Sequence, residues 1–425
     1  MPSTSTRDNS RISIWRALGP GFVVAATGVG AGDLIAAAVA GRRFGLAVLW
    51  VVVLGALFKF VLNEGVSRWQ LSTGTTLIEG WTERLPRWVS WYFLAYLLLW
   101  SFLVAAALSS ACGVAAGALF PALDLPVWVW SFAHALTAFL FVWWGRYSGF
   151  ERVMKVLIGT MFGLVIICAF FLGPPMAEFF SGLFVPSIPE GSPRFLLGVM
   201  GGVGGSATLL CYGYWIREKG WAGPSMHRRS LLDLFSAYLV TGLFGIALIV
   251  IAAQVNPTDA SGSALILALS DRLGELLGPV GRGAFLVGFW CAVFTSMLGV
   301  WQGVPYLFSD TVRVMRKRSG RDRLVDQGSD LNRTPLYRVF LVFLAFPPLI
   351  LLVWQKPVAI VILYAVAGAF FMPFLATVLL VLNNRREWVG DLRNPFAVNV
   401  LLALSLVLFA TIFVFEVVER FGLTG

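Results

Sequence analysis

Long apolar runs are the feature that most constrains the fold of this chain. Each run approaches or exceeds the ~20 residues that a helix needs to cross the hydrocarbon core of a bilayer. The eleven runs cover residues 17–40, 46–68, 89–119, 127–144, 153–173, 194–216, 231–254, 283–309, 336–354, 357–383 and 395–418. The sequence therefore predicts an all-α integral membrane protein, with a single membrane domain over residues 1–425.

Composition and charge support this class. Hydrophobic residues make up 58% of the 425 residues and charged residues only 13%, about half the share in a soluble domain. The net charge of +10 comes from Lys and Arg at the ends of the runs, which favours a lipid bilayer over nucleic acid as partner. With a cytoplasmic N-terminus, 24 Lys and Arg residues fall inside and seven outside. We therefore expect a multi-pass protein of the inner membrane, with its C-terminus outside and no cleaved signal peptide.

Two clusters of glycines interrupt these runs. Residues 28–33 (Gly-Val-Gly-Ala-Gly-Asp) lie in the first run, and residues 201–207 (Gly-Gly-Val-Gly-Gly-Ser-Ala) lie in the sixth. Glycine weakens a helix, and broken helices in matching places of two halves point to a substrate site between inverted repeats. The pattern predicts a secondary transporter whose two breaks face each other.

The polar residues at the breaks suggest an oxygen-lined site. Asp33 supplies a carboxylate, Ser206 and Thr208 supply hydroxyls, and unwound backbone supplies carbonyls. Such donors suit Mg²⁺, Ca²⁺ or Mn²⁺, whereas a lone carboxylate also suits the ammonium of an organic solute. A final set of weaker candidates to line the pocket comprises Tyr212, Tyr214 and Gln302.

Other ionisable residues receive less specific interpretations. Glu64 stands near the inner end of the second run, where it either lines an inner vestibule or pairs with Arg68 one turn on. We expect His134 to serve helix packing and Asp310 to lie at the membrane interface. No nucleophile–base arrangement, phosphate loop or cofactor motif is present, so the sequence predicts neither an enzyme nor a bound cofactor.

Several motifs resemble those of the Nramp (natural resistance-associated macrophage protein) family of divalent-metal transporters. They are residues 19–22 (Gly-Pro-Gly-Phe), the break at 28–33, residues 72–80 (Ser-Thr-Gly-Thr-Thr-Leu-Ile-Glu-Gly), residues 372–374 (Met-Pro-Phe) and the spacing of the runs. The resemblance implies a LeuT-type fold with a 5+5 inverted repeat. Spans 1–5 within residues 15–173 would form the first repeat, spans 6–10 within 194–383 the inverted one, and 395–418 an added eleventh helix.

The resemblance also exposes departures at the family's metal site. The family's Asp-Pro-Gly-Asn aligns with residues 30–33, so Gly30 replaces the metal-binding aspartate and Asp33 takes the asparagine position. Its Met-Pro-His aligns with residues 210–212 (Leu-Cys-Tyr), and the backbone-carbonyl position falls on Ala207. Residues 96–119 contain no Asp or Glu, although the family's proton route uses carboxylates there.

We therefore expect a carrier of a hard, partly hydrated divalent cation such as Mg²⁺ or Mn²⁺, without obligatory proton coupling. The expected metal ligands are Asp33 and the carbonyls of Gly30 and Ala207. Two alternatives stay open: a carrier of a small organic solute such as an amine or amino acid, and a sensor or scaffold that keeps the fold without transport. The sequence leaves the oligomeric state open and is compatible with a monomer.

Overall fold

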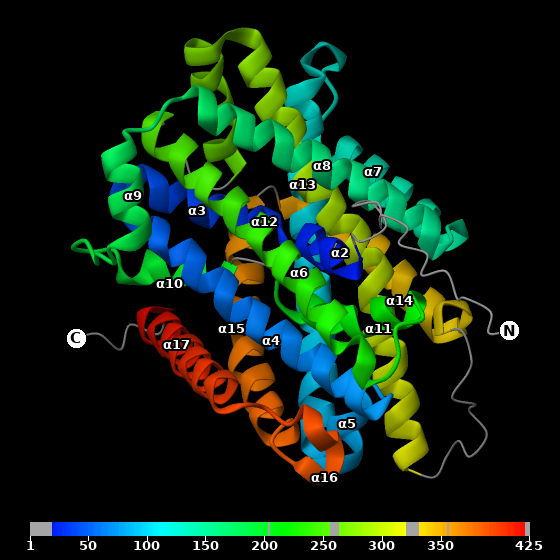
Figure 1. Ribbon diagram of the computed structural model, residues 1–425. Coiled ribbons are helices and arrows are strands. Elements are labelled where there is room, and N and C mark those ends of the chain that lie inside the picture. Colours follow the sequence, from blue (N-terminus) through cyan, green and yellow to red (C-terminus); the bar gives the residue numbers. More distant parts are fainter. Residues whose placement is uncertain (1–18, 203–204, 256–262, 320–330, 355–356, 421–425) are drawn as a thin grey trace, which may run out of the picture.

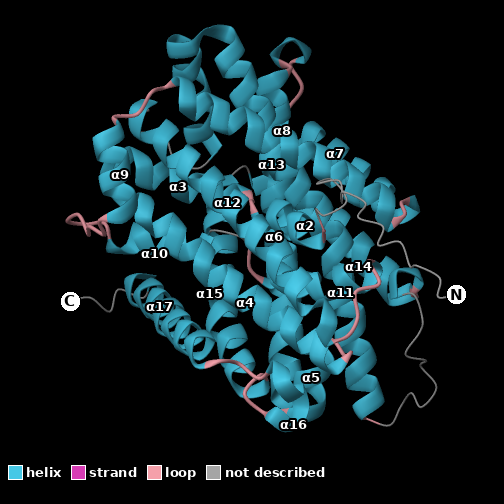
Figure 2. Cartoon of the chain, in the orientation of Figure 1, coloured by secondary structure: helices cyan, strands magenta, loops and turns pink. Residues whose placement is uncertain are grey.

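The computed structural model describes residues 19–202, 205–255, 263–319, 331–354 and 357–420. Every regular element in these ranges is a helix, and short turns connect most of them (Figures 1 and 2). The first half consists of α2 (Pro20–Gly28), α3 (Ala31–Phe44), η1 (Gly45–Val48), α4 (Leu49–Thr73), α5 (Leu77–Arg84), α6 (Arg87–Leu119), η2 (Pro121–Leu123), α7 (Val127–Trp144), α8 (Tyr147–Phe171) and α9 (Met176–Phe184).

The second half begins with another pair of short helices. Its elements are α10 (Pro193–Gly202), η3 (Ala207–Leu210), α11 (Cys211–Glu218), η4 (Pro224–Met226), α12 (His227–Val255), α13 (Ser263–Arg318), η5 (Leu331–Arg333), α14 (Pro335–Ala345), η6 (Pro347–Trp354), α15 (Pro357–Leu382), α16 (Arg386–Val389), η7 (Gly390–Leu392) and α17 (Phe396–Arg420). The helix α13 is kinked at Gly278, whose φ of 74° lies outside helical values and which precedes Pro279.

The predicted breaks are confirmed. The first helix stops at Gly28, and α3 starts at Ala31, so the interruption falls within residues 28–33. The second interruption separates the end of α10 at Gly202 from the start of η3 at Ala207. Both glycine clusters therefore end a helix, as their low helix propensity predicts.

The number of membrane spans stays a prediction. Seven helices of the described chain are long and apolar enough to cross a bilayer, or eight if the bent pair Arg386–Leu392 and Phe396–Thr411 counts as one span. The breaks divide the first and sixth runs into shorter helices, which this criterion does not count. Of the tenth run it finds only the shorter apolar helix Phe371–Leu382, and the eleventh belongs to the bent pair. The all-helical architecture itself is the predicted one.

Long helices from distant parts of the chain form the interior. The helix α13 lies against α6 and α8, and α12 lies against α3 and α4. Near the centre of the bundle, α2 contacts both α12 and α13, so the first break is enclosed by these helices (Figure 1). Fully buried tryptophans fill the core, namely Trp69, Trp81, Trp100, Trp215 and Trp301.

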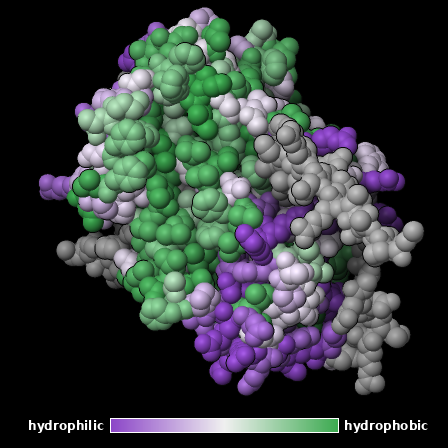
Figure 3. Space-filling model, in the orientation of Figure 1, coloured by the Kyte–Doolittle hydropathy of each residue, from purple (hydrophilic) through white to green (hydrophobic). Residues whose placement is uncertain are grey.

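The outer surface is strongly apolar. Large side chains such as Phe170, which is 76% exposed, and Val280, which is 83% exposed, point outward. Figure 3 shows hydrophobic residues over most of the visible face, with hydrophilic ones gathered at the lower end, where α5 and α16 lie in Figure 1. A surface of this kind fits a bilayer, because hydrocarbon does not penalise exposed apolar side chains as water does.

Candidate functional site

The two helix breaks contact each other through glycine backbone. A methyl group placed at Gly205 would lie 3.1 Å from the Cα atom of Gly28 and 2.5 Å from the Thr208 Oγ1 atom. Gly205 also has a φ of 83°, a conformation that only glycine adopts at little cost. Glycine is therefore required there both for space and for backbone geometry.

The other end of α2 is held by a buried carboxylate from α12. Asp233 accepts hydrogen bonds from the backbone N–H groups of Gly19, at 2.9 Å, and Gly21, at 2.7 Å. A methyl group at either glycine would come within 3.0 Å of Asp233, so α2 and α12 approach too closely for a larger residue. A carboxylate at a helix N-terminus also interacts favourably with the helix dipole.

The broken end of α2 is held by α13. The Ser296 hydroxyl donates to the Thr27 carbonyl at 2.8 Å, and a methyl group at Gly299 would overlap the Thr27 side chain. The N–H of Val29 closes the helix on the Ala25 carbonyl at 3.2 Å. These contacts fix where α2 ends and thus position the break.

The second break carries hydroxyls that its surroundings do not satisfy. Ser206 is 7% exposed and Thr208 is 3% exposed, yet neither hydroxyl has a hydrogen-bond partner in the described part of the chain. Gly368 of α15 faces the first of them, since a methyl group there would lie 3.5 Å from the Ser206 Oγ atom. A buried polar group without a partner costs about 1–3 kcal/mol, so these oxygens are suited to a ligand.

A lysine also reaches the second break. Lys59 of α4 is 0% exposed, and its Nζ atom donates a hydrogen bond to the Gly205 carbonyl. The same atom lies 5.8 Å from the ring centroid of Phe409 on α17, within cation–π range. The site thus contains a positive charge in addition to its oxygen atoms.

The three predicted metal ligands lie at or beside the two breaks, and the structure describes each of them to a different extent. Asp33 is the third residue of α3, but its side chain lies outside what the structure describes. The Gly30 carbonyl accepts the N–H of Leu34 at 3.2 Å, so it begins the hydrogen-bonding pattern of α3. Ala207 is the first residue of η3 and is fully buried beside the break. The described residues contain no group of three His, Cys, Asp or Glu side chains that would hold a metal.

The tyrosines of α11 point to other partners. The Tyr212 hydroxyl donates to Asp233 at 3.0 Å, and Asp233 lies at the N-terminal end of α2, away from the break. The Tyr214 hydroxyl donates to Asp310 on α13 at 2.6 Å. In this structure both hydroxyls hold helices together.

Gln302 has a similar structural role. Its Oε1 atom accepts from the Trp215 indole N–H at 2.5 Å, and its backbone carbonyl accepts from the Tyr337 hydroxyl at 2.8 Å. These bonds connect α13 with α11 and α14. His134 behaves as predicted, because it accepts from the Trp290 indole N–H at 2.9 Å and links α7 with α13.

Glu64 is paired in this structure, and its vestibule role stays a prediction. The side chain is 4% exposed and pairs with Arg68 at 2.7 Å and with His227 at 2.7 Å. The Arg68 pair is the other role that the sequence left open. Glu64 is enclosed here because Arg68 on α4 and His227 on α12 lie against its carboxylate.

Asp310 belongs to a buried charged group that we name the Asp310 cluster. Its members are Thr76, Glu79, Tyr214, Asp310 and Arg313. Asp310 is 0% exposed within the bundle, and its expected position at the membrane interface stays a prediction. Its carboxylate accepts from the Thr76 hydroxyl at 2.6 Å, and from Arg313, which also pairs with Glu79 at 2.5 Å. The cluster ties α5 and α11 to the last part of α13.

Glu79 remains charged in this cluster. Burial by itself would raise the pKa of Glu79, but hydrogen bonds from Arg313 and from the Thr76 N–H lower it, helped by the positive charges of Arg313 and Arg217. The net result is a Glu79 pKa below its ordinary value of 4.5. The carboxylate is therefore an ion-pair partner at neutral pH.

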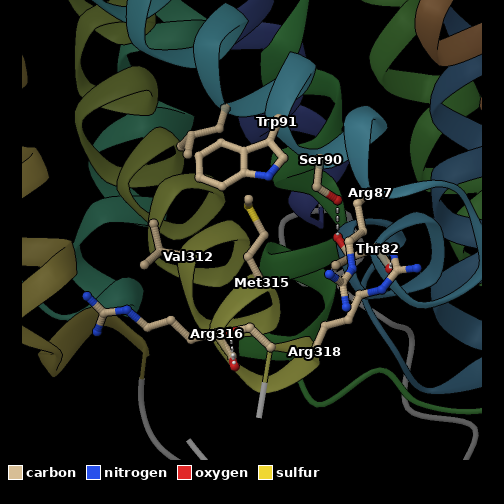
Figure 4. Close-up of a pocket in the computed structure, with 10 residues that line it drawn as sticks. Thr82, Arg87, Ser90, Trp91, Val312, Met315, Arg316 and Arg318 are labelled. Atoms are coloured by element: carbon tan, nitrogen blue, oxygen red, sulfur yellow. Dashed lines mark hydrogen bonds between the residues drawn. The ribbon is translucent and has the colours of Figure 1, made fainter. Parts of the chain in front are cut away.

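Two cavities lie away from the breaks. One, of about 330 Å³, is situated between α5, α6 and the end of α13, where Trp91 and Met315 form an apolar wall and Arg87, Arg316 and Arg318 line the rim (Figure 4). The other, of about 390 Å³, has a polar lining that includes Glu218 and Gln302. Neither lining contains a residue of the two breaks, so we do not assign the substrate to either cavity.

Sequence reasoning did not single out Lys59 or Asp233, and it expected Asp310 at the membrane interface. Lys59 lies within the second apolar run, and an ionisable side chain within a membrane span is a functional candidate by default. Its position within an apolar run was the available signal. Asp233 and Asp310 stand near the ends of their runs, where sequence alone does not separate a buried carboxylate from an interfacial one.

Comparison with known proteins identifies the family. The family model described as natural resistance-associated macrophage protein-like (Nramp) matches residues 21–419, which is nearly the whole chain. The chain belongs to the Nramp family. It is therefore a multi-pass membrane protein of a family of transporters.

Individual relatives of this Nramp protein agree in length and fold. The divalent metal cation transporter MntH of Bacillus subtilis (strain 168) is 23% identical over 423 residues, covering 95% of this chain and 92% of the relative. A crystal structure of a variant of the Eremococcus coleocola manganese transporter is 17% identical, covers 100% of this chain and 92% of that one, and gives a TM-score of 0.72. MhsT in complex with L-phenylalanine gives a TM-score of 0.56 at 17% identity, over 94% and 99% of the two chains. These neighbours confirm the predicted LeuT-type fold.

Proposed function

We propose that this Nramp protein is a secondary transporter that carries a divalent metal cation through a site between the two helix breaks. The observation that carries the proposal is the pair of buried, unpartnered hydroxyls of Ser206 and Thr208, beside a break that contacts Gly28. Asp33 follows the first break within one turn and supplies the carboxylate. The name of the Bacillus subtilis relative, which spans nearly the whole chain, supports the same cargo.

The donor set favours a hard cation. Oxygen ligands suit Mg²⁺ and Mn²⁺, whereas thioether sulfur favours later transition metals. Leu210, which takes the place of the family's methionine, offers no sulfur, and Cys211 is oriented toward Gly303 of α13. We therefore propose little preference for Cd²⁺ over Mg²⁺, and a cation that enters the site partly hydrated.

The proposed transport is not obligatorily proton-coupled. A proton route across a membrane protein needs titratable side chains at intervals. Residues 96–119 of α6 contain no Asp or Glu, and Tyr212 stands where the family's histidine does. The cation would then move down its own gradient and the membrane potential of the inner membrane, in a protein whose N-terminus is cytoplasmic.

Proteoliposomes test the proposal directly. We expect saturable Mn²⁺ uptake without acidification of the lumen. The substitution Asp33→Asn should weaken Mn²⁺ binding about 100-fold, because loss of an ion's charged ligand costs a few kcal/mol and ~1.4 kcal/mol is tenfold. The exposed loop residue Asp124 provides the control, since Asp124→Asn removes the same charge far from the breaks.

Three results would contradict parts of the proposal. Unchanged Mn²⁺ affinity in Asp33→Asn would place the site elsewhere. Substrate-dependent acidification would establish proton coupling. Stabilisation by amino acids or amines in a thermal-shift panel, without stabilisation by any divalent ion, would favour an organic solute instead.

A further inference from the structure

Lys59 places a full positive charge inside an apolar bundle. The residue is 0% exposed in the long helix α4, and a charge there is costly unless the surrounding groups stabilise it. Stabilising groups come from the second break and from α17. The Gly205 carbonyl accepts a hydrogen bond from Nζ, and the Phe409 ring presents its π system 5.8 Å away. The ammonium is therefore built into the fold at this position.

The Gly205 carbonyl is also part of the candidate substrate site. It belongs to the second break and immediately precedes Ser206, whose hydroxyl has no partner in the described chain. Carbonyl oxygens bind ammonium groups and hard metal cations by the same electrostatic attraction. Two positive charges at one carbonyl repel strongly in a low-dielectric interior. The ammonium and an incoming cation thus compete for the same place.

We infer that Lys59 is a surrogate cation. Its ammonium takes the place of the transported ion in the empty carrier and leaves the Gly205 carbonyl when a divalent cation binds. The inference rests on the proposed function and adds a step to it. A carrier without a coupled ion must return empty, and an empty site of inward-facing oxygens is costly to bury. A tethered ammonium satisfies the Gly205 carbonyl during the return and so replaces the second ion at that oxygen.

Binding measurements on the full-length protein in nanodiscs test the first half of the inference. Isothermal titration with Mn²⁺ should give at least tenfold tighter binding for Lys59→Met than for wild type, because the competing charge is gone. Lys59→Arg should stay near wild type. The matched control is Lys155→Met on α8, which removes a lysine paired with Glu151 at 2.8 Å and should leave Mn²⁺ affinity unchanged.

Flux measurements test the second half. Net Mn²⁺ uptake requires the empty carrier to return, whereas exchange of labelled for unlabelled Mn²⁺ requires only the loaded one. We expect Lys59→Met to slow net uptake at least tenfold while it retains exchange. A purely structural role for Lys59 would lower both rates together. Lys59→Gln, which keeps a hydrogen-bond donor without charge, serves if the methionine variant does not fold.

The outcomes separate this inference from the proposed function. If wild type and Lys59→Met bind Mn²⁺ equally, the inference is overturned and the proposed function stands. If only Lys59→Met binds Mn²⁺, Lys59 blocks the site instead of alternating with the ion, and both the inference and divalent transport by the wild type are overturned. If no variant binds a divalent ion and an amino acid stabilises wild type but not Lys59→Met, Lys59 is a carboxylate partner and the inference is overturned.

Discussion

The Asp310 cluster and the facing helix breaks both bury polar groups in an apolar bundle. The two regions differ in how completely these groups are hydrogen-bonded. In the cluster, the Asp310 carboxylate has hydrogen-bond donors at the N-cap of α5, on α11 and on α13, and Glu79 shares the Arg313 guanidinium. At the second break, the Ser206 and Thr208 hydroxyls have no partner in the described chain. A complete network holds helices in place, whereas an incomplete one is ready to receive a ligand. The contrast distinguishes the structural region from the functional one.

The largest expected effect comes from breaking the cluster. Arg313→Leu should destabilise the protein by about 3–5 kcal/mol, because it leaves the fully buried Asp310 carboxylate without its cation. Chemical unfolding in detergent measures the loss. Lys317→Leu is the control on the same helix, since its pair with Glu83 spans 3.7 Å between half-exposed side chains and should contribute about 0–1 kcal/mol. Equal losses in the two variants would mean that burial of Asp310 does not matter.

A substitution at the second break should change the free energy of unfolding by a smaller amount and in the opposite direction. Thr208→Val keeps the shape of the side chain and removes an unsatisfied hydroxyl, so it should raise stability by about 1 kcal/mol. It should also lower Mn²⁺ affinity up to about tenfold, because a donor oxygen is lost, with ~1.4 kcal/mol per factor of ten. Thr241→Val is the matched control, since that buried hydroxyl donates to the Ala237 carbonyl at 3.0 Å.

The two threonine variants are informative as a pair. Thr241→Val should lose a little stability, because the Thr241 hydroxyl has a hydrogen-bond partner within α12. It should keep the wild-type Mn²⁺ affinity. If Thr208→Val also loses stability, the hydroxyl at the break is part of the fold. The second break would then be a structural region like the Asp310 cluster, and not a binding site set apart by its unpartnered hydroxyls.

The sequence predicted the architecture of this protein better than its interior chemistry. Apolar runs and glycine clusters depend on local composition, so the breaks near Gly28 and Gly202 were predictable. The charged interior depends on which helices meet. Nothing near Lys59 in sequence indicates that its ammonium reaches Gly205, which is 146 residues away. The same holds for Tyr212, whose hydroxyl meets Asp233 near the far end of α2 rather than the break.

The smallest effect concerns the pH dependence of the Asp310 cluster. Glu79 has a pKa below 4.5 in the folded protein, so the folded state binds fewer protons than the unfolded state near that pH. Its contribution to stability is therefore complete above pH 4.5 and is lost as the pH falls through the lower folded value. Glu79→Gln keeps the capping of α5, because glutamine fills that position as glutamate does, but it removes the charge. The loss of stability in Glu79→Gln should be modest, since Arg313 keeps Asp310 as a partner.

Unfolding curves measure this difference. Wild type should be more stable than Glu79→Gln at pH 7, and the gap in the free energy of unfolding should narrow as the solution is acidified below pH 4.5. The control Glu83→Gln, at the 45% exposed neighbour on α5, should show almost no gap at either pH. A gap for Glu79→Gln that persisted unchanged into strong acid would mean that Glu79 acts through packing and not through its charge.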